Sequence, residues 1–152
     1  MKVGATSAWE VVPLGTLADF RNGVNYTKKS FGRGIKIVNV KNFKDYSIAS
    51  YDDLDEIDPD GVVRSDDVLR DNDIIFVRSN GNRELIGRTM FISAPRERVT
   101  HSAFTIRARF RSDRVLPRFY AYLFRSSLIR DTLSAKGGGT NISNLNQGIF
   151  QA

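Results

Sequence analysis

The sequence lacks several residue types that many functions require. It contains no cysteine and a single histidine, His101. The absence of cysteine excludes disulfides, thiolate zinc sites and cysteine nucleophiles, and one histidine excludes every metal centre built from several histidines. No apolar run approaches the roughly 18 residues that a membrane span needs, and the N-terminus lacks the apolar core of a secretion signal. We therefore expect a soluble, cytoplasmic chain with no membrane partner.

Several catalytic signatures are also missing. No two prolines are adjacent, so the Asn/Asp-Pro-Pro-aromatic signature of amino-group methyltransferases is absent. No lysine has an acid two residues before it, as the common nuclease core requires, and no Gly-Lys pair exists for a phosphate-binding loop. A lone histidine such as His101 is far more often structural than part of a Ser-His-Asp relay. We expect no enzymatic activity, no metal and no cofactor.

Basic residues outnumber acidic ones and are unevenly distributed. The chain has 23 Lys and Arg against 17 Asp and Glu, a formal net charge of +6. Residues 1–50 carry a net +5, residues 51–75 a net −8 and residues 76–152 a net +9, and arginine dominates the last block. Its planar guanidinium suits phosphates and guanine edges. Two basic blocks around an acidic one indicate a polyanion-binding face, although an ordinary basic protein with solvated arginines has the same composition.

The length of 152 residues, 17.1 kDa, suits one compact domain, 1–152. Residues 22–34 are predicted as a polar loop, and residues 44–70 as a surface excursion. Periodicity, capping and turn residues assign eight segments. They are a strand over 9–12, a helix over 14–20, a strand over 35–40, a β-like stretch at 61–63, a strand over 74–77, its hairpin partner over 87–93, a strand over 103–111 and a helical region over 117–136. The mixed order predicts an α+β fold with a twisted, mostly antiparallel sheet and a few short helices.

The clearest alternation runs over residues 103–111. Phe104, Ile106, Ala108 and Phe110 alternate with Thr105 and three arginines, so we expect the apolar set to face the core. The arginines are expected on the solvent face, with a basic platform as the alternative. The aromatic and leucine side chains assigned to the core are Trp9, Phe104, Phe110, Phe119, Tyr120, Leu123 and Phe124.

Several motifs follow one another along the chain in a distinctive order and spacing. An opening group consists of WEVVPLGTL at 9–17, Gly23 and GIKIVNV at 34–40. A central group consists of LRDNDIIFVRSNG at 69–81 and IGR at 86–88, and a closing group of KGGGT at 136–140 and ISNL at 142–145. Together they resemble a target recognition domain in the specificity subunits of type I restriction–modification systems, with Asn72 in place of the usual glycine of the central turn.

The resemblance implies a module that reads one half of a split double-stranded DNA target and performs no chemistry itself. Its implied partners are an adenine methyltransferase (modification) subunit, which binds S-adenosylmethionine, and a restriction subunit. Family members usually continue into a long helix that spaces two such domains. This chain stops at residue 152, before such a helix, so we expect an isolated domain or a truncated gene product.

Reading a duplex requires cations that hold phosphates and polar side chains that reach base edges. Loops fixed between strands suit this task, and those at 25–30 and 78–83 qualify best. The segment at 136–141 is a separate candidate that wraps backbone phosphates with the N–H groups of its three glycines, and a plain linker is the alternative for it. The candidate DNA contacts are Lys28, Lys29, Arg33, Lys36, Arg78, Ser79, Asn80, Asn82, Arg83, Arg88, Lys136, Thr140 and Asn141. Two alternatives stay open: a general RNA or single-stranded nucleic-acid binder that uses the same cations, and a small metal-dependent nuclease that uses the acids at 52–73.

Overall fold

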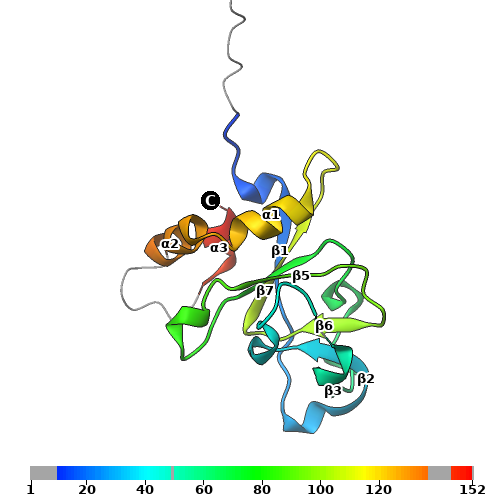
Figure 1. The fold of residues 1–152 in the computed structure, drawn as a ribbon. Helices are drawn as coiled ribbons and strands as arrows, with labels where there is room; N and C mark the ends of the chain where they lie inside the picture. The colour runs from blue at the N-terminus through cyan, green and yellow to red at the C-terminus, as the bar shows by residue number, and fades with distance from the viewer. Residues whose placement is uncertain (1–9, 49, 137–144, 152) are drawn as a thin grey trace, which may run out of the picture.

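The computed structural model describes residues 10–48, 50–136 and 145–151, and strands precede helices within them (Figure 1). The strands are β1 (Ala18–Asn22), β2 (Phe31–Val38), β3 (Asp55–Ile57), β4 (Ile74–Val77), β5 (Thr89–Phe91), β6 (Val99–His101) and β7 (Thr105–Phe110). The helices are α1 (Pro117–Phe124), α2 (Ser127–Lys136) and α3 (Gln147–Gln151), and short 3-10 turns lie in the connections. No helix within these ranges is long and apolar enough to cross a bilayer. The predicted α+β class is confirmed.

The larger sheet has the strand order β1-β7-β4-β5, and every pair in it is antiparallel. All four residues of β4 are buried, as its continuous apolar run predicts. β5 pairs with β4 as the expected hairpin partner, with Ile75 opposite Met90. The predicted strands over 74–77 and 87–93 are therefore confirmed, and they place the loop at 78–83 at one end of this sheet.

The smaller sheet has the order β3-β2-β6, with β2 antiparallel to β3 and parallel to β6. β2 begins four residues before the predicted strand, and its register against β3 shifts between Phe31 and Ile35. Gly34 lies at this shift with a φ of 142°, where a Cβ would approach Pro59 Cδ to 2.6 Å. The β-like stretch predicted at 61–63 is wrong: this segment is a turn, and the strand of this region is β3, whose Ile57 is buried.

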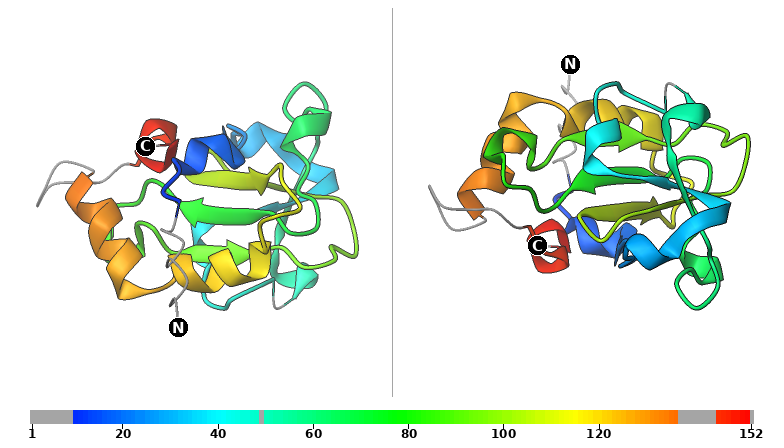
Figure 2. Two further views of the ribbon diagram at one scale, coloured as in Figure 1. Left: turned by 90° about the horizontal axis from the view of Figure 1, so that it is seen from above. Right: turned by 90° about the horizontal axis from the view of Figure 1, so that it is seen from below.

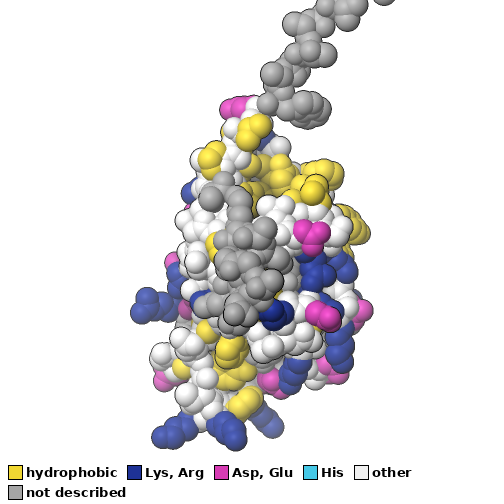
Figure 3. Space-filling view, turned by 90° about the vertical axis from the view of Figure 1, so that its left-hand side faces the viewer, with side chains coloured by type: hydrophobic (Ala, Val, Ile, Leu, Met, Phe, Trp, Pro, Cys, Tyr) yellow, Lys and Arg dark blue, Asp and Glu magenta, His cyan; other side chains and the backbone are white. Residues whose placement is uncertain are grey.

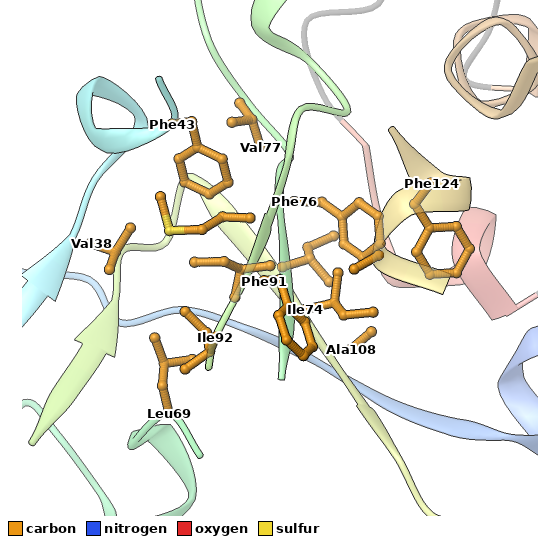
Figure 4. Close-up of a cluster of buried hydrophobic side chains, with 14 of the residues drawn as sticks. Val38, Phe43, Leu69, Ile74, Phe76, Val77, Phe91, Ile92, Ala108 and Phe124 are labelled. Atoms are coloured by element: carbon orange, nitrogen blue, oxygen red, sulfur yellow. The ribbon is translucent and has the colours of Figure 1, made fainter. Parts of the chain in front are cut away.

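The helices pack on the larger sheet on the side away from the smaller sheet (Figure 1). Phe76 of β4 connects the layers, because its ring centroid lies 5.3 Å from that of Phe124 in α1 and 4.7 Å from that of Phe150 in α3. Figure 4 shows Phe76 and Phe124 together, with further apolar side chains extending toward Val38 of β2. Figure 2 shows α2 beyond the ends of the strands, beside the turn at 83–85. One apolar core thus spans both sheets and the helices.

The predicted start of the chain needs correction. Residues 10–13 have no regular structure and Val11 is 93% exposed, so the strand over 9–12 is wrong where it is described, and Trp9 lies outside the described residues. The predicted helix over 14–20 is a 3-10 turn, η1 (Leu14–Thr16), followed by β1. Local spacing favours a helix here, but pairing with β7 across about ninety residues buries Ala18 and Phe20 on alternate positions.

Strand β7 is confirmed, but its predicted solvent face is wrong. Its first four residues are all buried, and Arg107 is 4% exposed. Arg107 donates to the Asp66 carbonyl, and Arg109 donates from Nε and Nη2 to Asp73 at 2.8 Å and to the Val68 carbonyl at 3.1 Å. The acidic segment therefore covers this face of the strand, and neither a wet face nor an open basic platform exists at these two arginines.

The acids of residues 51–75 serve as internal partners. Arg21 Nε lies 2.7 Å from Asp67 Oδ1. Burial alone would raise the pKa of Asp67, but the Arg64 N–H and the Arg21 guanidinium outweigh it and hold this pKa below its usual value. Within the described ranges, no group of three or more His, Asp or Glu side chains is placed to hold a metal ion. The arrangement gives the nuclease alternative no support.

Three aromatic assignments to the core have different outcomes. Phe124 is 6% exposed, as expected. Phe104 and Phe119 are 56% and 57% exposed, so their assignment to the core is wrong. Phe104 precedes β7 at the turn out of β6, where the alternation of the strand does not yet apply. α3, which the sequence did not predict, supplies Phe150 instead, and its ring stacks on Phe20 with centroids 5.5 Å apart.

His101 lies fully buried at the end of β6, with Nδ1 2.8 Å from Thr105 Oγ1. Burial, reinforced by the positive charge of Arg107, lowers the pKa of His101 from 6.5 to about 3, although Asp67 opposes the shift and Arg21 and Arg109 add to it. The unfolded chain binds a proton at this residue below pH 6.5, whereas the folded chain does so only near pH 3. Stability is therefore fully present above pH 6.5 and is lost as the pH falls toward 3.

We expect the free energy of unfolding to fall by about 1.4 kcal/mol per pH unit below pH 6.5 through this residue. Urea unfolding of the wild type and of His101→Gln at pH 7.0, 5.5 and 4.5 measures it. The variant carries no titrating group at this position, so its stability should change much less over the same interval. Equal pH dependence in the two proteins would show that another group titrates.

Candidate nucleic-acid interface

A cavity of about 500 Å³ lies where segments distant in sequence meet. Its lining residues come from the loop after β1, the chain around the end of β2, β3, the loop after β4 and the turn before β7. They are Tyr26, Asn39, Val40, Lys41, Asp55, Ser79, Asn80, Gly81 and Phe104. The two loops that the sequence singles out, 25–30 and 78–83, therefore contribute to one surface.

A chain of hydrogen bonds fixes one wall of this cavity. The Tyr26 hydroxyl donates to Asn39 Oδ1 at 2.9 Å, and Asn39 Nδ2 donates to Asp55 Oδ2 at 3.1 Å. Lys41 Nζ donates to the same carboxylate at 2.8 Å. These partners hold polar groups in place at the rim before any ligand arrives, which lowers the entropy lost on binding.

Another part of the lining is the loop after β4, which the backbone of Phe104 holds in place. The Phe104 carbonyl accepts from the N–H of Arg78 at 2.9 Å and from that of Ser79 at 3.3 Å. Asn80 Oδ1 accepts from the N–H of Asn82 at 2.8 Å. That bond fixes the side chain of Asn80, which lines the cavity. A side-chain amide held in this way is suited to hydrogen bonding with base edges.

Exposed aromatic side chains lie beside these polar groups. Phe104 lines the cavity, and Phe31 at the start of β2 is 51% exposed. The rings of Tyr26 and Phe31 meet edge to face with centroids 5.8 Å apart. Figure 3 shows hydrophobic side chains gathered in the lower part of the molecule, with Lys and Arg side chains below them. The surface therefore combines apolar contact area, hydrogen-bonding groups and positive charge.

The predicted cations of the first loop lie close to this cavity along the chain. Lys28 and Lys29 are exposed on the 3-10 turn η2 (Lys28–Ser30), whose start is capped by the Thr27 hydroxyl accepting from the Lys29 N–H at 3.3 Å. Arg33 is exposed on β2. Lys36 is partly buried, and its Nζ lies 3.5 Å from Glu56 Oε2. The first three are available to phosphates, whereas Lys36 already has an internal partner.

Arg78 has an internal role in this fold. Its Nε donates to the Leu145 carbonyl at 3.2 Å and its Nη1 donates to the Ala103 carbonyl at 3.1 Å. The Leu145 N–H donates back to the Arg78 carbonyl at 2.7 Å. These contacts tie the segment before α3 to the end of β4, so the guanidinium holds the loop rather than standing open beside it.

The other predicted residues are spread more widely. Asn82 accepts from the Glu84 N–H at 3.0 Å and caps η6 (Arg83–Leu85), on which Arg83 is exposed. Arg88 lies in a different pocket. Lys136 is the last residue of α2, and Thr140 and Asn141 lie outside the described residues.

Several cavity residues were absent from the predicted set, namely Tyr26, Asn39, Val40, Lys41, Asp55, Gly81 and Phe104. Asn39 carried a signal, because it interrupts the apolar run at the end of the strand over 35–40. Phe104 carried a misleading signal, since it extends the alternation of β7 by one position and was therefore assigned to the core. Asp55 carried none, because its place depends on the pairing of β3 with β2.

Two curated proteins are similar to this chain in sequence, at low identity. The chain is 25% identical, over 93% of its length, to the type I restriction enzyme EcoKI specificity subunit of Escherichia coli (strain K12). It is 23% identical, also over 93% of its length, to the StySPI specificity subunit of Salmonella potsdam. In both cases it spans 31% of the relative's length. No family model matches the chain.

Solved structures share the fold. The HsdS subunit from Thermoanaerobacter tengcongensis superposes with a TM-score of 0.66 at 15% identity, over 99% of this chain and 34% of that one. The S subunit of a type I restriction–modification system from M. genitalium gives 0.56 at 12% identity, over 92% and 32%. The predicted resemblance to a target recognition domain of a type I specificity subunit is confirmed.

Proposed function

We propose that this chain recognises a sequence in double-stranded DNA as a target recognition domain, reading one half of a split target. The observation that supports this most is the shared cavity of the two predicted loops, with polar groups of its lining fixed by hydrogen bonds. Two exposed lysines on η2 follow the lining residue Tyr26 along the chain. Two parts of the surface thus suit the two tasks of a DNA reader, phosphate contact and base contact.

In this proposal the exposed cations set the position on the duplex and the cavity residues select the sequence. Lys28, Lys29 and Arg83 contact phosphates, while Ser79 and Asn80 reach base edges in the major groove. Phe104 offers apolar contact of the kind that favours a thymine methyl group. Lys36 and Arg78 act by holding the strands and loops that carry these residues, given their internal partners.

The proposed partners are an adenine methyltransferase (modification) subunit and a restriction subunit of the same system. The chain spans about a third of the curated relatives it matches, so these partners belong to the proposal. The domain itself performs no catalysis and needs no cofactor in this account, because chemistry resides in the partners. A cytoplasmic location, where those partners and the DNA are found, is part of the same proposal.

Selection from a randomised DNA duplex pool tests the function with the 152-residue chain alone. We expect a short sequence to be enriched over successive rounds at about 50 mM salt, where phosphate contacts are strong. Single-stranded DNA and RNA serve as competitors. The proposal is wrong if no sequence is enriched, or if single strands displace the duplex from the protein. The second result would assign the chain to general single-strand binding.

The lysines of η2 supply a quantitative prediction. We expect the double variant Lys28→Ala/Lys29→Ala to bind the selected duplex roughly tenfold more weakly near 100 mM salt, with the slope of log affinity against log salt reduced by about two. Titration by fluorescence anisotropy over a salt series measures both. Arg114→Ala is a control that removes one charge, because Arg114 is exposed in the β7–α1 loop, which lies at the opposite end of the molecule from η2 in Figure 1. A loss in this control equal to half that of the double variant, on the logarithmic scale, would indicate a non-specific charge effect.

A further inference from the structure

A second pocket, of about 300 Å³, gathers four cationic side chains. It is lined by Phe43, Lys44, Asp45, Arg88, Thr89, Arg125 and Arg130, and Asp45 is the one acid among these lining residues. The cavity of about 500 Å³, here named the recognition cavity, is lined in part by Val40 and Lys41, whereas this pocket is lined in part by Phe43 and Lys44. The two hollows are therefore connected along the chain through η3 (Val40–Asn42) and the residues that follow it.

The four cations come from separate parts of the fold. Lys44 follows η3, Arg88 precedes β5, Arg125 caps the end of α1 and Arg130 lies in α2. The five ion pairs of the described residues involve none of the four. The fold thus brings four positive charges from separate elements to one pocket, where they repel one another unless an anion lies between them. This arrangement differs from the charged outer face of a single helix, whose side chains point into solvent.

Two of the arginines are held in position. The Arg125 guanidinium lies over the Tyr46 ring at 5.0 Å from its centroid, and the Tyr46 ring stacks on Tyr122 at 4.6 Å. Arg130 Nη2 donates to the Glu84 carbonyl at 2.5 Å. Arg130 Nε is buried and has no hydrogen-bond partner in the described part of the chain. A buried donor without an acceptor costs free energy, and the side chain that carries this donor lines the pocket.

We propose that this pocket binds a phosphate group of the DNA backbone next to the recognition cavity, an inference that rests on the proposed function. Arginine donors form paired, charge-assisted hydrogen bonds with phosphate oxygens. The Cα atoms of Lys41 and Lys44 are separated by three residues, which can span at most about 10 Å. The major groove is about 12 Å wide and has a phosphate backbone along each side. When the recognition cavity faces the bases of the groove, one of these two backbones lies within reach of the pocket.

The test uses the full chain with two charges of the pocket removed. Lys44→Gln/Arg88→Gln removes both charges and keeps polar side chains, and neither residue has a partner in an ion pair of the described residues. We expect binding to the selected duplex to weaken roughly tenfold near 100 mM salt, with the salt slope reduced by about two and the selected sequence unchanged. Arg114→Gln is a control that removes one charge outside the pocket, and equal thermal unfolding temperatures of the wild type and the double variant confirm that the double variant is folded.

The result separates this inference from the proposed function. If Lys44→Gln/Arg88→Gln binds like the wild type while Lys28→Ala/Lys29→Ala loses affinity, the pocket does not contact the backbone, although the chain reads DNA. If the wild type binds no duplex, both proposals fail together.

A second measurement uses inorganic phosphate and follows the side-chain Nε–Hε signals of Arg125 and Arg130 by NMR. We expect phosphate to shift these signals in the wild type and to leave them in place in the double variant. Shifts with free phosphate combined with unchanged DNA binding would assign the pocket to a free anion and overturn the backbone contact. Poly-L-glutamate is the third probe, and its binding without any effect on DNA would assign the pocket to an acidic polypeptide.

Discussion

Gly23→Ala is expected to lower the free energy of unfolding by about 3 kcal/mol or more, close to the limit of what single substitutions do. A Cβ at this position would lie 2.1 Å from the Ser102 carbonyl oxygen and 2.3 Å from that of His101. Both are backbone atoms, so no side-chain rotation relieves the contact. For a chain of this length we expect the thermal unfolding midpoint to fall by roughly 10 °C.

The position of Gly23 explains why the effect spreads through the fold. Its N–H donates to the Thr105 carbonyl at 3.1 Å, and the next residue forms a bridge to Ser102. If the backbone at Gly23 is displaced, the end of β1 moves away from the turn between β6 and β7. Gly81→Ala is the matched control, because a Cβ there meets no atom within 4 Å and its φ is not in the left-handed region. Equal stability of the two variants would show that the backbone at Gly23 relaxes easily.

The local hydrophobic pattern was sufficient to predict elements whose surroundings agree with it. The apolar run at 74–77 predicted β4 correctly because all four of its residues are buried, with β7 and β5 paired to its two edges and aromatic rings from α1 and α3 packed on Phe76. The helix that starts at Pro117 was equally readable, since proline at the first position and apolar spacing agree there. In these segments, neighbours in sequence carry most of the information.

Local pattern failed where a distant segment changed the surroundings. The alternation at 103–111 is real, but the acidic segment lies over the face that the arginines occupy, so a polar face became an interior one. The helix expected over 14–20 failed for a related reason, because β7 offers backbone partners that no local window reveals. In both cases, contacts with a segment distant in sequence determined the structure, and local spacing does not reveal such contacts.

The candidate site was predictable in outline. Asn, Ser and Lys in loops between strands pointed to 25–30 and 78–83, and the fold joins these loops at one cavity. The partners Asn39 and Asp55 were not predictable, because their meeting with Tyr26 depends on the register of β2 against β3. The count of cations was also misleading, since Arg107 and Arg109 face the acidic segment and Arg78 holds carbonyls.

Asp73→Ala is expected to lower the free energy of unfolding by about 3 to 5 kcal/mol, because it breaks a buried ion pair and leaves the arginine behind. The Asp73 side chain is 1% exposed and lies 2.8 Å from Arg109 Nη2, whose side chain is 19% exposed. Its second oxygen accepts from Arg109 Nε, and the carboxylate also accepts from the Arg70 N–H at 2.7 Å. Alanine removes every one of these acceptors, and urea unfolding near pH 7 measures the loss.

An exposed pair between β1 and the residue that follows β7 is the matched control for this prediction. Asp19 lies 2.9 Å from Arg111 Nη1, but the two side chains are 58% and 47% exposed. Water screens that pair, so Asp19→Ala should lower stability by no more than about 1 kcal/mol. Similar losses in Asp19→Ala and Asp73→Ala would mean that the acidic segment merely lies against β7. A much larger loss in Asp73→Ala would establish that the acidic segment stabilises β7 by neutralising its buried arginines.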